Sequence, residues 1–129
     1  MSFMGRGLMH QASPEQLERM VSHWMKKING TSEQTSKITA LVIEAQKDLK
    51  PLREKMIELH EKKRNALLGR EVDGGALEAI RKEGLLVHDQ TSARMNRFLV
   101  DAAQVLSPEQ RAQMNQHLRE RRAHRQQAK

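Results

Sequence analysis

Apolar residues recur at steps of three and four along most of the chain, which is the spacing of one face of an α-helix. The first such stripe consists of Leu17, Met20, Val21, Trp24, Met25 and Ile28. It predicts an amphipathic helix that begins after Ser13. Asn29-Gly30 follows the stripe directly and predicts the end of this helix, because both residue types close helices readily.

A longer stripe predicts a second helix from about residue 32 to residue 68. Its members are Ile38, Val42, Ala45, Leu49, Leu52, Met56 and Leu59. Their alternating steps of four and three are typical of the heptad seam of a coiled coil. Pro51 lies inside this helix and cannot donate to the carbonyl of Lys47, so we expect a kink near Pro51. Gly69 is expected to end the helix.

The next segment predicts a turn at Asp73-Gly74-Gly75 and a third helix from about residue 76 to residue 106. The residues expected to face inward are Leu77, Ile80, Val87, Met95, Phe98, Leu99, Ala102 and Val105. Gly84 falls on the same stripe, where it allows close approach or bending. A fourth helix is expected to start at Ser107 and to fray into the basic tail at residues 119–129.

One helix-start phrase occurs three times in the chain. The copies are Ser13-Pro14-Glu15-Gln16, Thr31-Ser32-Glu33-Gln34 and Ser107-Pro108-Glu109-Gln110. In each copy the Ser or Thr oxygen can accept from a free backbone N–H, and the Gln three residues later can reach back to the cap residue. The glutamates favour the positive end of the helix dipole, and proline is tolerated at the first helical position.

No segment alternates apolar and polar residues with the period of a strand, so the sequence predicts an all-α fold. We expect four helices, one short, two long and one C-terminal, with the two long ones forming an elongated antiparallel hairpin. Residues 13–125 are expected to form this helical domain. A flexible segment with Met and His residues at 1–12 precedes it, and a disordered basic tail at 126–129 follows it.

Composition adds that one copy has little with which to build a core. The aromatic residues are Phe3, Trp24 and Phe98 alone, and only 37% of the chain is apolar. Large aromatic side chains carry much of the buried area of ordinary domains. We therefore expect the helices to be completed by a second copy, which predicts a homodimer.

The chain is strongly basic, with a net charge of +7. Such a charge favours nucleic acid, anionic membrane surfaces or acidic partners. The basic tail of Arg119, Arg121, Arg122, Arg125 and Lys129 contains no interleaved aromatic residue that could stack on bases, so we do not expect nucleic-acid binding. No stretch is long and apolar enough to span a membrane. Residues 1–10 lack the apolar region of a secretory signal, so the chain is expected to be either cytoplasmic or a processed form.

Enzymatic chemistry is not expected. The chain has no cysteine, no glycine-rich loop after a strand and no pair of carboxylates in an apolar setting. No two histidines stand at the i, i+3 or i+4 spacing of metal ligands on a helix. Met4, Met9 and His10 form the best cluster of soft ligands, for copper, but we favour a flexible segment there and expect neither a metal nor a cofactor.

Two of the helix starts resemble the repeated Leu-Thr-x-x-Gln motif of the Spy/CpxP family of periplasmic stress proteins. The matching segments are Leu106-Ser107-Pro108-Glu109-Gln110, with Ser in place of Thr, and Gly30-Thr31-Ser32-Glu33-Gln34, with Gly in place of Leu. The resemblance implies a periplasmic protein that forms an antiparallel, cradle-shaped dimer. It also implies ATP-independent chaperone activity, restraint of an envelope-stress sensor kinase, or binding of zinc, nickel or cobalt in related branches.

The histidine positions depart from the metal-sensing branch. His88 precedes Met95 by seven residues rather than four, and the first helix contains only His23. The leading hypothesis is therefore a chaperone that binds unfolded or misfolded envelope proteins. The alternative is a regulatory protein that binds the periplasmic domain of a sensor kinase or senses a metal. Candidate client contacts are Met20, Trp24, Met25, Met56, Leu59, Met95 and Phe98, with Arg53, Lys55, Lys62, Lys63 and Arg97 supplying charge.

Overall fold

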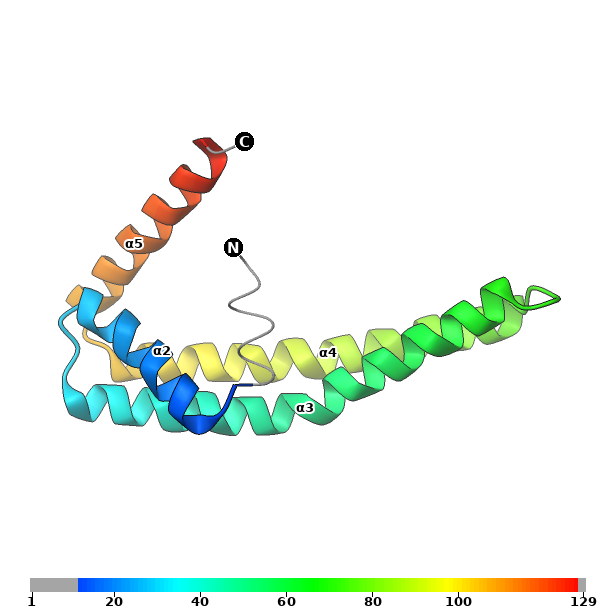
Figure 1. The fold of residues 1–129 in the computed structure, drawn as a ribbon, viewed down its shortest axis with the longest axis horizontal. Coiled ribbons are helices and arrows are strands. Elements are labelled where there is room, and N and C mark those ends of the chain that lie inside the picture. The colour runs from blue at the N-terminus through cyan, green and yellow to red at the C-terminus, as the bar shows by residue number, and fades with distance from the viewer. Residues whose placement is uncertain (1–11, 128–129) are drawn as a thin grey trace. The chain divides into compact units, whose positions relative to one another are not determined.

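The computed structural model describes residues 12–127, and four helices account for most of them. They are α2 (Pro14–Lys27), α3 (Ser32–Leu68), α4 (Gly74–Val105) and α5 (Pro108–Gln127) (Figure 1). Between residues 12 and 127 there is no strand, which confirms the all-α prediction. The last helix stays regular to Gln127, so the expectation that it frays from residue 119 is wrong.

The three predicted capping boxes are all present. The backbone N–H groups of Gln16, Gln34 and Gln110 donate to the side-chain oxygens of Ser13, Thr31 and Ser107 at 3.2, 3.0 and 3.1 Å. In return, each cap residue donates its own N–H to the amide oxygen of that glutamine, at 2.8, 3.0 and 2.9 Å. Two otherwise free donors are therefore satisfied at each of these helix starts.

Helix α2 ends in a Schellman motif. Gly30 N–H donates to the Met25 carbonyl at 2.8 Å, and Asn29 N–H donates to the Lys26 carbonyl at 3.5 Å. Asn29 takes the left-handed backbone, with φ of 56°, whereas Gly30 does not. The predicted stop at Asn29-Gly30 is confirmed, and asparagine supplies its unusual conformation.

The connection between α3 and α4 is shorter than the sequence predicts. Helix α4 begins at Gly74 rather than near residue 76, because Asp73 acts as its cap residue. The Asp73 carboxylate accepts from the Ala76 N–H at 2.9 Å. The backbone N–H of Asp73 donates to the Ala66 carbonyl, also at 2.9 Å. The two glycines are thus the first residues of the helix rather than part of a turn.

The chain divides into two compact units. The first unit comprises the described residues up to Ile43 and from Phe98 onward, and the second comprises Glu44–Arg97. In the first unit, α2 lies on the adjoining parts of α3 and α4 (Figure 1). Its core contains Ala12, Leu17, Val21, Met25, Ile28 and Val42, with Met20, Ile38, Ile43, Phe98, Leu106 and Met114 partly buried against them. Leu99 was expected to face inward, but it is 56% exposed.

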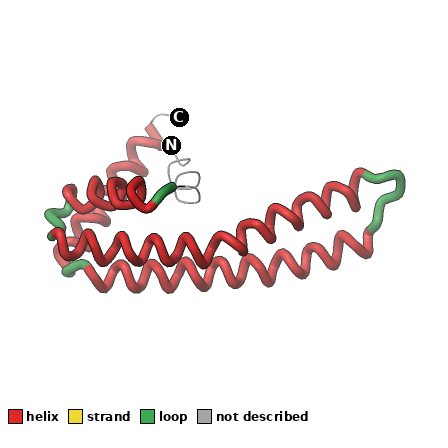
Figure 2. Tube along the Cα trace, turned by 60° about the horizontal axis from the view of Figure 1, so that its bottom comes forward, coloured by secondary structure: helices red, strands yellow, loops and turns green. Residues whose placement is uncertain are grey.

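The second unit is a hairpin in which the remaining parts of α3 and α4 run antiparallel, side by side (Figures 1 and 2). The buried residues of this hairpin are Ala45, Leu49, Leu59 and Val87. Helix α3 runs through Pro51, and the kink there stays a prediction. A Cβ atom at Gly84 would meet no atom within 4 Å, so the close approach expected at this glycine is not made among the described residues.

Among the described residues, three ion pairs join the helices of the hairpin. Arg97 Nη2 lies 3.7 Å from Asp48 Oδ2, and the other two pairs are shorter. Arg94 Nε lies 2.8 Å from Asp48 Oδ2, and Lys55 Nζ lies 2.9 Å from Glu83 Oε1. The hydrogen bond from Lys55 lowers the pKa of the Glu83 carboxyl, and the same bond raises the pKa of Lys55. None of the described helices is long and apolar enough to cross a membrane.

Candidate apolar binding groove

Four helix ends meet at a pair of glutamine side chains in the first unit. Gln34 Nε2 donates to Gln110 Oε1 at 2.8 Å, and Gln110 Nε2 donates to Gln34 Oε1 at 2.9 Å. The second N–H of each amide donates to a helix-end carbonyl, from Gln34 to Val105 at 3.0 Å and from Gln110 to Asn29 at 3.4 Å. We call this pair, with its two carbonyl partners, the glutamine junction.

The glutamine junction uses all the hydrogen-bonding capacity of its amides. Each side-chain oxygen accepts once from its own cap residue and once from the other glutamine, and each side-chain nitrogen donates twice. An amide has one acceptor oxygen with two lone pairs and two donor hydrogens, so no group of either side chain is left over. The end of α2, the start of α3, the end of α4 and the start of α5 are therefore fixed together.

Arg111 adds a second link beside the junction. Its Nη1 donates to the carbonyls of Ala103 and Leu106, at 3.0 and 3.1 Å. Carbonyls at the end of a helix have no partner within that helix, so the guanidinium caps the end of α4. Helix α5 is thereby held at its first turn against the helix that precedes it.

An apolar cavity of about 700 Å³ opens in the first unit between α2, α5 and the adjoining parts of α3 and α4. We call it the apolar groove. Its apolar lining consists of Met20, Val21, Trp24, Met25, Ile38, Val42, Phe98, Leu99, Ala102, Ala103, Leu106, Met114 and Leu118. Its polar lining consists of Arg111, Asn115, Arg121 and Arg125. Among the described residues, no carboxylate lines the groove, and the charged side chains that line it are arginines.

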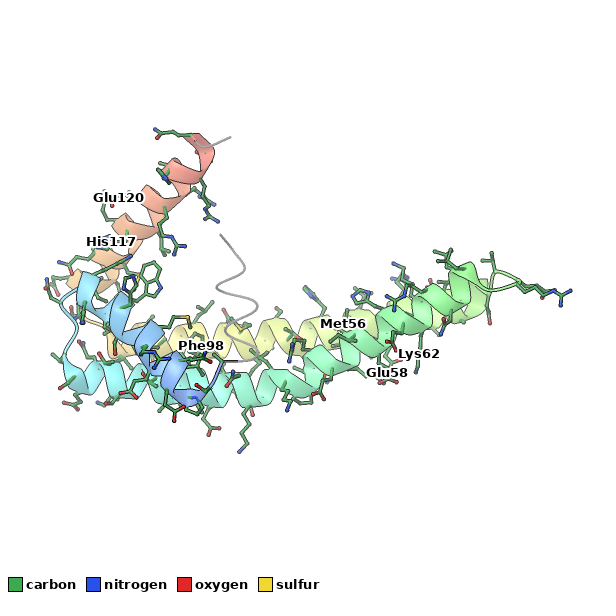
Figure 3. The ribbon with its side chains drawn as sticks, viewed as in Figure 1. Met56, Glu58, Lys62, Phe98, His117 and Glu120 are labelled. Carbon is green, nitrogen blue, oxygen red and sulfur yellow. The ribbon has the colours of Figure 1, made fainter. Side chains whose placement is uncertain are left out.

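The ring of Trp24 lies against cationic side chains from both α2 and α5. Arg121 Cζ of α5 lies 5.1 Å from the centre of the Trp24 ring, and Lys27 Nζ lies 4.6 Å from it. Both distances are within the range of cation–π attraction. One turn earlier on α5, His117 Nε2 lies 3.1 Å from the Lys27 carbonyl and Nδ1 lies 3.9 Å from Glu120 (Figure 3). These contacts connect the end of α2 with the middle of α5.

The match to known families covers most of the chain. Residues 16–118 match the LTXXQ motif family. The chain belongs to that family. The resemblance drawn from the two motifs is therefore confirmed, since the LTXXQ motif family contains the Spy/CpxP and zinc resistance-associated periplasmic proteins. No curated protein and no solved structure matches the chain.

The two LTXXQ motifs supply the glutamine junction. Their glutamines, Gln34 and Gln110, are 76 residues apart in sequence, yet they bond directly to each other. At the first position of the first motif, Gly30 stands where Leu is usual. A Cβ atom there would collide with the terminal methyl group of Met25 and lie 3.0 Å from Met25 Cβ. Glycine in place of the usual Leu therefore fits the close approach of Gly30 to Met25 at the end of α2.

Four of the predicted client contacts line the apolar groove: Met20, Trp24, Met25 and Phe98. Met20, Trp24 and Phe98 are half-buried, whereas Met25 is only 3% exposed and belongs to the floor of the groove. Figure 3 shows Phe98 on α4 beneath α2. The predicted client contacts on α2 and near the end of α4 thus lie together in the apolar groove.

The other predicted contacts lie in the second unit. Leu59 is buried at 2% exposure, and Met56 and Met95 are half-buried. Three of the predicted cations are paired with carboxylates of the same hairpin: Lys55 with Glu83, Lys62 with Glu58 and Arg97 with Asp48. Glu58 and Lys62 project together from α3 (Figure 3). Lys63 is exposed, and Arg53 is half-buried, with its Nε finding no hydrogen-bond partner among the described residues.

Sequence reasoning missed the contribution of α5 to the groove. Met114, Leu118, Arg121 and Arg125 follow one another at steps of four, three and four, which places them on one face of this helix. The apolar members of this stripe are few, and its arginines belong to the basic tail expected at residues 119–129, so the sequence analysis did not predict the stripe. The spacing of these residues was the signal that could have revealed it.

Between residues 12 and 127, no group of three or more His, Asp or Glu side chains could hold a metal ion. The soft-ligand candidates Met4, Met9 and His10 lie outside the described residues.

Proposed function

We propose that this protein is an ATP-independent chaperone of the bacterial periplasm, which binds unfolded or misfolded envelope proteins and has no enzymatic activity. The observation that carries the proposal is the apolar groove with its positive charges. Family membership supports the compartment, because the family contains the Spy/CpxP proteins.

The lining of the groove suits clients of varied sequence. Leu99 and Leu118 line it and are 56% and 50% exposed, so apolar surface is offered to solvent there. Met20, Met25 and Met114 contribute flexible thioether side chains, which adapt to differently shaped apolar groups. Such a surface holds exposed side chains of a client without selecting one sequence.

The charge of the groove adds a preference for acidic clients. Arg121 and Arg125 line it, and no Asp or Glu between residues 12 and 127 does. Complementary charge raises the rate of encounter more than the final affinity. Weak apolar contacts combined with fast capture allow release without a nucleotide.

A second copy is part of this proposal. The hairpin of the second unit leaves Leu85 and Leu86 57% and 67% exposed, and Ile57 52% exposed. A two-helix hairpin has no third layer to cover such residues, whereas another hairpin would supply one. We therefore propose a homodimer formed through the second unit.

The direct test is light scattering by a chemically denatured acidic client that is diluted into buffer with an equimolar amount of the protein. The wild type should suppress aggregation, and suppression should weaken as salt rises. Leu99→Glu places a charge in the groove at an exposed site, so it should weaken client holding about tenfold, the loss expected for one buried leucine contact.

Leu68→Glu is the matched control, because Leu68 is 76% exposed and lies outside the groove at the end of α3. It should suppress aggregation as the wild type does. If the wild type gives no suppression at low salt, or if Leu68→Glu is as damaging as Leu99→Glu, the groove is not the site of a chaperone.

A further inference from the structure

The arginine side chains that line the apolar groove differ in their contacts. Arg111 is engaged by the carbonyls of Ala103 and Leu106. Arg121 has the ring of Trp24 as its neighbour, and neither Arg121 nor Arg125 has a carboxylate partner among the described residues. Arg121 and Arg125 are one helical turn apart on α5, so both guanidinium groups lie on the same face.

The groove is therefore divided lengthwise into an apolar part and a cationic part. Arg121 follows Arg111 by ten positions in α5, which corresponds to about 15 Å along a helix. Met114 and Leu118 lie between them on the groove side. The volume of about 700 Å³ falls in the range of pockets that enclose small molecules.

We propose that the apolar groove binds a free single-chain amphiphile with an anionic head, of the fatty-acid type. The alkyl chain lies among the apolar side chains, and the carboxylate accepts hydrogen bonds from Arg121 and Arg125. Charge complementarity identifies the head, because the unpaired groups at this end are guanidinium groups and guanidinium pairs with carboxylate in a two-pronged geometry. The lining identifies the tail.

A polypeptide enclosed in the groove fits this lining less well. Each residue of an extended chain brings an N–H and a C=O that need partners when they are removed from water. Apart from the Trp24 indole, Asn115 is the one uncharged polar side chain among the described residues that line the groove, and the surrounding backbone is helical and already paired. An alkyl chain brings no such groups. Client side chains can still touch the groove while their backbone stays in water, so the two proposals are separate.

Trp24 makes the inference directly measurable. It is the sole tryptophan of a chain that has no tyrosine, and it lines the groove. Its fluorescence emission is followed while dodecanoate is added below its micelle concentration. Dodecyltrimethylammonium, which has the same chain and a positive head, is titrated in parallel. We expect a saturable change for dodecanoate with one ligand per chain, and an affinity for the cationic amphiphile at least tenfold weaker.

Variants on α5 locate the head group. Arg121→Gln and Arg125→Gln should each weaken dodecanoate binding about tenfold, the effect of losing one charge-assisted hydrogen bond. Arg119→Gln and Arg122→Gln remove the same charge from the same helix at positions that do not line the groove, so they should leave binding unchanged. All four arginines are exposed, and circular dichroism verifies that helix content is kept.

Three results would overturn the inference. The first is equal binding of the two amphiphiles, which would show apolar association without head-group recognition. The second is equal loss in all four arginine variants, which would show a diffuse charge effect. The third is a Trp24 response to an acidic amphipathic peptide with none to dodecanoate, which would assign the groove to peptides. The titration contains no client, so suppression of aggregation without dodecanoate binding would remove this inference and leave the proposed function standing.

Discussion

Two neighbouring residues determine how α2 ends. Asn29 holds the left-handed backbone that the Schellman motif requires, and Gly30 passes so close to Met25 that a side chain there would collide with it. The sequence indicated the stop but not this division of roles. Both residue types accept a left-handed backbone, and the close contact at Gly30 depends on where the buried side chain of Met25 lies.

Replacing Gly30 therefore has a measurable cost. Gly30→Ala should lower the free energy of unfolding by about 1–3 kcal/mol, because the added Cβ forces Met25 to move within a packed core. Urea unfolding followed by circular dichroism measures the loss. Gly75→Ala, in the first turn of α4, is the control, since the nearest atom to its new Cβ is 3.6 Å away. Equal stability of the two variants would mean that Gly30 is not confined.

At the level of the helices, capping was predictable and the pairing of the caps was not. Each capping box involves residues three apart, so the phrase that begins with Ser or Thr and ends with Gln is enough to locate it. The bond between Gln34 and Gln110 joins positions 76 residues apart, and nothing in either phrase says that the two starts meet. The same distinction explains why helix faces were largely predicted while the groove, which needs α5 placed against α2, was not.

The glutamine junction should show strong coupling. Gln34→Ala and Gln110→Ala each leave the other amide short of a donor and an acceptor, so the double variant should lose less stability than the two single losses combined. We expect a coupling free energy of roughly 1–3 kcal/mol from a double-mutant cycle in urea. Gln16 provides the control, because within the described residues its side chain bonds only to its own cap residue, Ser13. Gln16→Ala combined with Gln110→Ala should be additive, and additivity in the first pair would contradict the junction.

The whole molecule has more apolar surface than one copy covers. Composition predicted this shortage of core, and the exposed residues Ile57, Leu85 and Leu86 of the second unit give it a location. Sequence periodicity could not say which leucines would be exposed. Leu85 and Leu86 are adjacent in α4 and lie about 100° apart around the helix axis, so the spacing of apolar residues alone does not decide whether either is covered.

Association through the second unit is testable by sedimentation at micromolar concentration. The wild type should sediment as a dimer, and the pair Leu85→Glu and Leu86→Glu should sediment as a monomer with unchanged helix content, because both sites are exposed within one copy. Val72→Glu, also exposed at 67% but outside the helices, should remain dimeric. A monomeric wild type would contradict the proposed homodimer.

The glutamine junction of Gln34 and Gln110 does not depend on the length of the hairpin. The bonds of the glutamine junction come from residues 29–34 and 105–110, and the link through Arg111 comes from residues 103–111. None of these bonds involves the hairpin at Glu44–Arg97. Adding one heptad to each arm of the hairpin would preserve the register of its seam and leave those bonds untouched. The length of the hairpin and the bonding of the helix ends can thus change separately, so the glutamine junction is compatible with hairpins of different lengths.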